Sequence, residues 1–115
     1  MYVEINLIIA SWQLKVNQYM FLLTDGGELP SRMFWPEDGS LYQVSCMLAD
    51  EYLCIVPQWL QFNLVDVTNN DDILYIYYVV LIPEQIQHKK GQWVYFNAIE
   101  SKEIMAKIME ATQKV

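Results

Sequence analysis

The feature that most constrains the fold is an uninterrupted apolar run, Ile73–Ile82, which reads ILYIYYVVLI. Most of its ten residues are β-branched or aromatic, the types that favour strands. The run is too short for a transmembrane helix, which needs about 20 apolar residues. A strand without polar alternation is typical of a sheet interior, where both faces are covered. The run therefore predicts a central strand, buried on both faces.

Further strands and turns are predicted around this run. The other strand-like segments are Tyr2–Trp12, Gln18–Leu23, Trp59–Val67 and Gln92–Asn97. Turn signals separate them, namely TDGG at 24–27, PEDGS at 36–40, TNNDD at 68–72 and HKKGQ at 88–92.

Two segments have the apolar spacing of helices. The first follows Ser40, a good N-cap, and places Leu41, Val44, Leu48 and Ile55 near one stripe, which Cys46, Met47 and Leu53 widen. The second covers about 101–113, with Ser101 as its N-cap. The predicted order is two or three strands, a helix, three strands and a helix. This order indicates an α+β chain with a mixed sheet packed by helices.

Composition limits the function classes. Residues 1–115 are expected to form one domain, because 54% are hydrophobic and 14% aromatic, enough for one packed core. The net charge of −7 argues against binding to nucleic acid or to an anionic membrane. The N-terminus is a poor signal peptide because it lacks a basic leader and carries Glu4 in its apolar stretch. Cys46 and Cys54 lie eight residues apart in one predicted helix, too far to bridge, so reduced core thiols and a cytoplasmic location are expected.

Several segments, in this order, resemble the Nudix hydrolase superfamily. YMFLLTDGGELPSR resembles the strand and turn that enter the family's LPGG sequence, with Leu29 and Pro30 at the LP and with Ser31 and Arg32 in place of the glycines. After the first helix, PQWLQFNLVDV and ILYIYYVVLIP resemble the next two strands, and GQWVYFNAIES resembles the closing strand before a helix. The resemblance covers roughly residues 18–114. It implies a Nudix-like mixed sheet packed between helices, an α/β/α sandwich.

The family's catalytic signature, G-x5-E-x7-R-E-U-x-E-E-x-G-U, is degenerate here. In the family, glutamates on one helix face hold the divalent cations that activate water on a diphosphate. Without gaps, the Arg-Glu pair falls on Met47 and Leu48, and the paired glutamates fall on Glu51 and Tyr52. A shift of one residue puts Asp50 and Glu51 at the acidic pair but Cys46 and Met47 at the Arg-Glu pair. One carboxylate is too few for a magnesium–diphosphate cluster, so we expect no cofactor, and Asp50 and Glu51 are vestigial metal or catalytic candidates.

Three hypotheses follow. The first is a catalytically silent Nudix-like domain that binds a ligand or protein partner, or associates with itself through exposed aromatics or an N-terminal edge strand, Tyr2–Trp12. The second is a divergent hydrolase of nucleoside diphosphate-linked substrates, which would need Mg²⁺ and carboxylates from Glu28, Glu37, Asp38 or Asp50 beside Glu51. The third is another α+β binding fold, with an accidental resemblance.

Four residues are candidates for binding a small nucleotide-like ligand. Trp35 and Glu37 belong to FWPED, which is able to form an aromatic wall over a pocket, whereas the plainer interpretation packs Trp35 on the core. Tyr75 and Tyr77 are able to line a groove, although tyrosines are also ordinary strand residues. Similarly, the plainer interpretation of Asp50 and Glu51 is an acidic pair on a solvated helix face.

Overall fold

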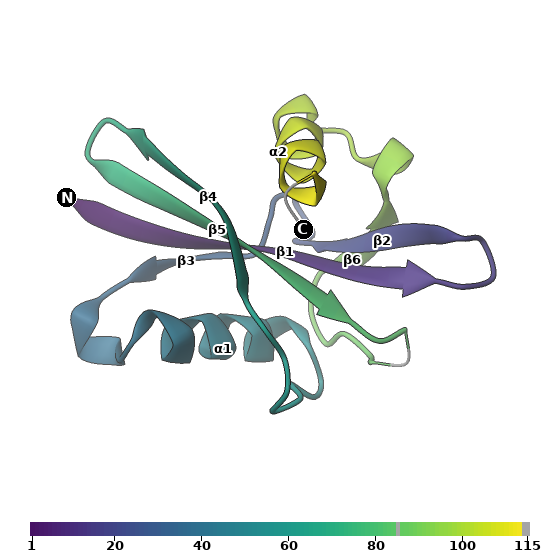
Figure 1. The fold of residues 1–115 in the computed structure, drawn as a ribbon, viewed down its shortest axis with the longest axis horizontal. Helices are drawn as coiled ribbons and strands as arrows, with labels where there is room; N and C mark the ends of the chain where they lie inside the picture. The colour runs from purple at the N-terminus through teal and green to yellow at the C-terminus, as the bar shows by residue number, and fades with distance from the viewer. Residues whose placement is uncertain (85, 114–115) are drawn as a thin grey trace.

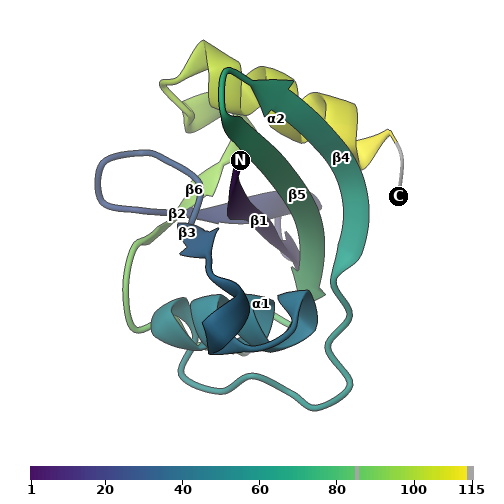
Figure 2. The same ribbon diagram turned by 90° about the vertical axis from the view of Figure 1, so that its left-hand side faces the viewer.

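The fold is a mixed sheet between two helices. The computed structural model describes residues 1–84 and 86–113. Six strands are present: β1 (Tyr2–Gln13), β2 (Gln18–Leu23), β3 (Ser31–Phe34), β4 (Asn63–Asn70), β5 (Ile73–Ile82) and β6 (Gln92–Tyr95). Their order is β4-β5-β1-β2-β6, and β3 pairs with β1 beside this path (Figure 1). Helix α1 (Leu41–Tyr52) covers one face and α2 (Lys102–Thr112) the other (Figure 2). The predicted α+β sandwich is therefore confirmed.

Strand β1 is the centre of the sheet. It pairs in parallel with β5 and antiparallel with β2 and β3. Its side chains alternate, so that Ile5, Leu7 and Ile9 pack toward α1 while Ile8 and Ala10 pack toward α2. The prediction of an exposed N-terminal edge strand is wrong, because a strand that is apolar on both faces is stable only inside the sheet. Strand β5 has neighbours on both sides, as predicted, but the predicted burial on both faces is only partly right: Ile76, Val79, Val80 and Ile82 are buried, five residues are half-buried and Leu81 is exposed.

Helix α1 begins where the sequence predicts. The Ser40 hydroxyl accepts a hydrogen bond from the Gln43 N–H at 3.1 Å, and the Gln43 side chain accepts one from the Ser40 N–H at 2.8 Å. This reciprocal capping box satisfies two backbone donors that have no partner within the helix. The helix ends at Tyr52, so Cys54 and Ile55 lie beyond it and are exposed. Their predicted places in the core are therefore wrong, and Cys46 is only half-buried.

Other boundaries differ from the prediction by a few residues. Strand β4 begins at Asn63, not at Trp59, and continues to Asn70 through residues predicted as a turn. Strand β6 stops at Tyr95 because the chain enters a 3₁₀ turn, η2 (Phe96–Ala98). A second 3₁₀ turn, η1 (Pro36–Asp38), leads from β3 into α1. Helix α2 begins after Ser101, whose hydroxyl accepts a hydrogen bond from the Ile104 N–H, as predicted.

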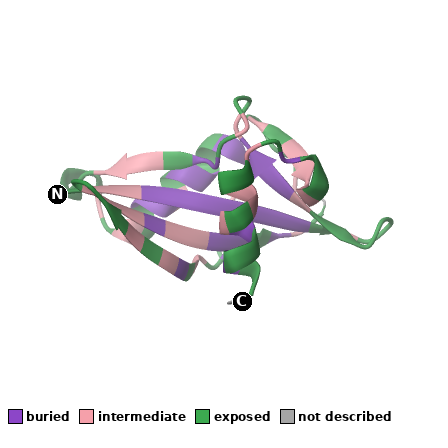
Figure 3. Cartoon of the chain, turned by 90° about the horizontal axis from the view of Figure 1, so that it is seen from above, coloured by how far each residue is buried: buried purple, intermediate pink, exposed green. Residues whose placement is uncertain are grey.

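The core divides into two halves, one on each face of the sheet. Buried residues are concentrated along the strands of the sheet (Figure 3). On the α1 side, Val44, Leu48 and Leu53 pack against Leu22 and Val80. The α2-side core contains Ile8, Phe21, Val79, Ile99 and Ile108. Among the described residues, no helix has the length and apolar character that crossing a membrane requires.

Candidate functional site

Glu51, which falls at an acidic position when the signature is laid on the sequence in either register, is held by a cation from β3. One guanidinium nitrogen of Arg32 lies 3.1 Å from a carboxylate oxygen of Glu51, and the other lies 3.9 Å from Asp38. Strand β3 places Arg32 there because it pairs with β1, where Arg32 stands opposite Ile5. The side chain at the second glycine position of LPGG therefore bridges β3, η1 and α1.

The loop between β5 and β6 adds two more cations at the same end of α1. Lys90 lies 3.9 Å from Glu51, and Lys89 lies 4.0 Å from Asp50. The Lys89 N–H donates to the Tyr52 carbonyl at 2.8 Å, which fixes the loop across the end of the helix. Each carboxylate of the predicted vestigial pair is thus neutralised by a lysine, with Arg32 as a further partner of Glu51.

Leu48 and Tyr52 lie where the ungapped signature has glutamates, and both are buried, whereas Met47, at the Arg position, is 41% exposed. Leu48 is 0% exposed and Tyr52 is 5% exposed, and they lie one turn apart within the α1-side core. Burial raises the pKa of Tyr52, and the charges of Glu51 and Asp25 raise it further. The Lys90 ammonium lies 5.0 Å from the centre of the Tyr52 ring. These side chains fill the helix face with packed apolar groups rather than metal ligands.

A divalent cation does not fit this arrangement. Glu51 already faces two cations, and its helical neighbours Leu48 and Tyr52 offer no carboxylate oxygen. Within residues 1–84 and 86–113, no three His, Cys, Asp or Glu side chains are grouped so that they could hold a metal ion. The carboxylates of Glu28 and Glu37 therefore do not complete a site around Glu51. Magnesium needs several oxygen ligands around it, and the structure supplies one carboxylate that is already paired.

The opposite face of the sheet carries a cleft, which we call the β1–β5 cleft. It has a volume of about 360 Å³ and lies between β1, β5, the residues before β3 and the first turns of α2. Two of the predicted ligand residues, Tyr75 and Tyr77, line it together, and both are half-buried. The other residues that matter for its chemistry are Glu4, Asn6, Glu28, Glu103 and Lys107.

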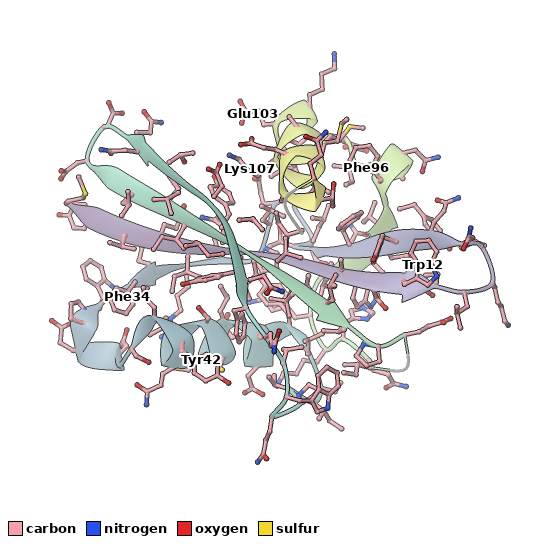
Figure 4. All side chains as sticks on the ribbon, viewed as in Figure 1. Trp12, Phe34, Tyr42, Phe96, Glu103 and Lys107 are labelled. Atoms are coloured by element: carbon pink, nitrogen blue, oxygen red, sulfur yellow. The ribbon has the colours of Figure 1, made fainter. Side chains whose placement is uncertain are left out.

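Lys107 is the cation of this cleft, and it is held by acidic partners. Its ammonium lies 2.7 Å from Asp66 and 3.7 Å from Glu110, and it lies 4.4 Å from the centre of the Tyr77 ring. Burial acts to lower the pKa of Lys107, but the hydrogen bond to Asp66 and the nearby carboxylates outweigh it, so that the pKa is raised. Burial also raises the pKa of Tyr77, against the lowering effect of Lys107. Figure 4 shows Glu103 and Lys107 on the same side of α2.

Asn6 has an unsatisfied polar group in the cleft. It is 8% exposed, and its Nδ2 atom is buried without a hydrogen-bond partner in the described part of the chain. Sequence reasoning missed Asn6 and Glu4 as functional residues. The available signal was their spacing, because two polar residues two apart in an otherwise apolar central strand must share one face.

Trp35 and Glu37 lie away from this cleft. Trp35 is 46% exposed, and its ring meets the edge of the Tyr2 ring with 6.0 Å between centroids. Glu37 lies in η1 and is exposed. The structure therefore brings together Tyr75 and Tyr77 but not all four predicted ligand residues.

The fold is similar to solved Nudix structures. The NUDIX domain of Shewanella oneidensis NrtR, solved with ADP ribose, is 15% identical, with 94% of this chain and 86% of that chain covered and a TM-score of 0.67. A C. elegans Ap4A hydrolase is 11% identical, with 98% and 97% covered and a TM-score of 0.73. The C-terminal domain of mouse MUTYH, solved with human PCNA, is 12% identical, with 98% and 88% covered and a TM-score of 0.71. No protein-family model matches the sequence, and the search of curated proteins finds no match. The chain thus has a Nudix-like fold, and identities this low carry the fold but not an activity.

Proposed function

We propose that this chain is a catalytically silent Nudix-like domain that acts by binding a small ligand or a protein partner. The observation that supports this most directly is the state of α1. Leu48 and Tyr52 are core residues, and Glu51 is paired with Arg32 and Lys90. Hydrolysis of a diphosphate needs metal ions held by several carboxylates. This helix face presents packed apolar side chains and one carboxylate, Glu51, whose charge is already neutralised.

The same fold serves binding in structurally similar proteins. The NrtR domain was solved with ADP ribose, and the MUTYH domain was solved with PCNA. Both small-ligand and protein binding are therefore compatible with this architecture, and we extend them to this chain as part of the proposal. The hydrolase alternative has less support, because among the described residues no three His, Cys, Asp or Glu side chains are grouped so that they could hold a metal ion, at Glu51 or elsewhere.

A protein partner or a second copy of the chain would find an apolar surface near the end of α1. Ile55 is 69% exposed and Trp59 is 63% exposed. They line a shallow groove of about 410 Å³ with Pro57, Pro83 and Ile86. Aromatic and aliphatic side chains of this kind are enriched at the centres of interfaces. Sedimentation velocity of the wild type and of Trp59→Ser tests self-association, because a dimer built on this groove would dissociate in the variant.

The decisive experiment is calorimetric titration with Mg²⁺ and Mn²⁺, with and without ADP-ribose, combined with a hydrolysis assay on ADP-ribose. We expect no metal binding at the α1 site and no metal-dependent turnover. Glu51→Gln and the matched variant Glu37→Gln, which removes a carboxylate from an exposed position in η1, should then behave alike. Metal-dependent hydrolysis that Glu51→Gln abolishes and Glu37→Gln preserves would overturn the proposal.

A further inference from the structure

The β1–β5 cleft has an excess of negative charge. Glu4, Glu28 and Glu103 line it, and in the described part of the chain no lysine or arginine forms an ion pair with any of these three carboxylates. Lys107 is the cleft's basic side chain, and its ammonium is already bound to Asp66 and close to Glu110. Because the carboxylates outnumber the basic side chain, the cleft repels a phosphate and attracts a cation.

The aromatic walls favour the same charge. Tyr75 and Tyr77 are neighbours on one face of β5, two residues apart, and both line the cleft. The faces of tyrosine rings attract amine and guanidinium groups that lie within about 6 Å. Lys107 already makes such a contact with Tyr77, at 4.4 Å. Tyr75 has no basic side chain over its ring among the described residues.

Asn6 supplies an independent sign of a ligand. A buried amide N–H₂ without a partner costs about 1–3 kcal/mol, so such groups are rare unless something else satisfies them. Asn6 lines the cleft, in the strand that carries Glu4, and its Nδ2 atom has no hydrogen-bond partner among the described residues. Because the Nδ2 atom is itself buried, the Asn6 side chain would turn toward the cleft to donate to a ligand that carries a carbonyl or another acceptor next to its positive charge.

We propose, on the basis of the binding function above, that the β1–β5 cleft holds a small organic cation that carries amine or guanidinium groups and a neighbouring hydrogen-bond acceptor. In this arrangement Glu4 and Glu103 neutralise the positive groups, Tyr75 packs on the guanidinium or amine face, and Asn6 donates to the acceptor. A bare metal ion is not the ligand, because the carboxylates are spread around about 360 Å³ and form no group that could hold a metal ion within the described residues.

The proposal is tested with argininamide, which carries two positive groups and a carbonyl. Two-dimensional ¹⁵N NMR of the full chain follows the backbone signals of β1, β5 and α2 during titration, and calorimetry gives the affinity. We expect saturable shifts at these elements, and affinity that falls as salt is raised. Free arginine, whose carboxylate faces the acidic cleft, should bind more weakly.

Variants separate the cleft from general attraction to an acidic protein. Glu4→Gln and Glu103→Gln should each weaken binding about fivefold, since a single charge pair in a partly solvated site contributes about 1 kcal/mol. Glu37→Gln removes an equal charge outside the cleft and should change affinity less than twofold. Asn6→Leu should weaken binding while it maintains or raises the thermal stability of the free protein, because it removes an unsatisfied donor.

Three results would overturn the proposal. The first is an absence of saturable shifts with argininamide, and the second is equal weakening by Glu4→Gln and Glu37→Gln. The third is ADP-ribose in the same cleft with higher affinity than argininamide. These outcomes are separate from the hydrolysis assay. If the protein neither hydrolyses ADP-ribose nor binds argininamide, only this inference is contradicted. Metal-dependent hydrolysis of ADP-ribose would instead contradict the proposed function.

Discussion

The guanidinium of Arg32 lies 3.1 Å from the carboxylate of Glu51, so a cation from the chain itself faces the acidic residue of α1. The contact joins residues 19 apart in sequence, on β3 and α1. Both side chains are partly exposed, at 31% for Arg32 and 41% for Glu51. The pair therefore fixes the orientation of two side chains more than it stabilises the fold.

Replacement of Arg32 by Gln should change stability little. We expect a loss below about 1 kcal/mol, because water screens partly exposed ion pairs. Urea unfolding of Arg32→Gln, with Lys90→Gln as the matched loss of the other cation near Glu51, measures the effect. A loss well above 2 kcal/mol in either variant would show that this ion-pair network contributes far more than a surface network does.

Leu48→Glu places a carboxylate at the signature position that Leu48 occupies. Leu48 is fully buried in the α1-side core, so we expect destabilisation of about 3 kcal/mol or more at pH 7. Burial raises the pKa of a carboxyl group, so the variant should lose stability as the pH rises above about 4.3, the usual glutamate value. Leu48→Met, which conserves volume, should cost less than about 1.5 kcal/mol. Equal stability of the two variants would contradict the burial of this position.

The raised pKa values of Lys107 and Tyr77 predict how the stability of the protein changes at alkaline pH. Both pKa values are raised above their ordinary values, 10.5 for lysine and 10.0 for tyrosine, so the folded protein holds these protons more tightly than the unfolded chain. Their contribution to stability is complete below about pH 10, and it is lost as the pH rises through the folded pKa values.

Urea unfolding between pH 7 and 11 measures this effect, because the range begins about three units below the unfolded pKa values and ends above both of them. Tyr77→Phe should show a shallower alkaline loss than the wild type. Lys107→Met removes one partner of Asp66, at 2.7 Å, and should cost about 2 kcal/mol already at pH 7. An identical alkaline slope in wild type and Tyr77→Phe would refute the assignment for the tyrosine.

The capping box at Ser40 predicts that replacement of this residue lowers the stability of the protein. Ser40→Ala removes the acceptor of the Gln43 N–H, and we expect a loss of about 1 kcal/mol. Ser101→Ala is the comparison, because Ser101 caps α2 through its hydroxyl, and only α1 has the reciprocal bond from the capping residue's N–H. Thermal unfolding followed by circular dichroism compares the two. No loss from Ser40→Ala would mean that packing, and not the cap, fixes the start of α1.

Local patterns were sufficient for most elements of the fold. The apolar run Ile73–Ile82 matches β5 at both ends, and Ser40 and Ser101 mark the starts of both helices. These features can be predicted from the sequence because strands, helix caps and turns depend mainly on residues that are neighbours in the sequence. The end of α1 was predicted too late, because the chain leaves the helix at Leu53 to pair with His88, a partner far along the sequence.

The candidate sites depended on contacts between distant segments. The sequence by itself determined that no Arg-Glu pair stands at residues 46–48, where either register of the signature would place it, since this follows from residue order. Only the tertiary structure placed Arg32 and Lys90 on Glu51 and gathered Glu4, Asn6, Tyr75 and Tyr77 around one cleft. The physical reason is the parallel pairing of β1 with β5. It aligns residues about 70 positions apart, such as Asn6 and Tyr77, in a register that no local preference encodes.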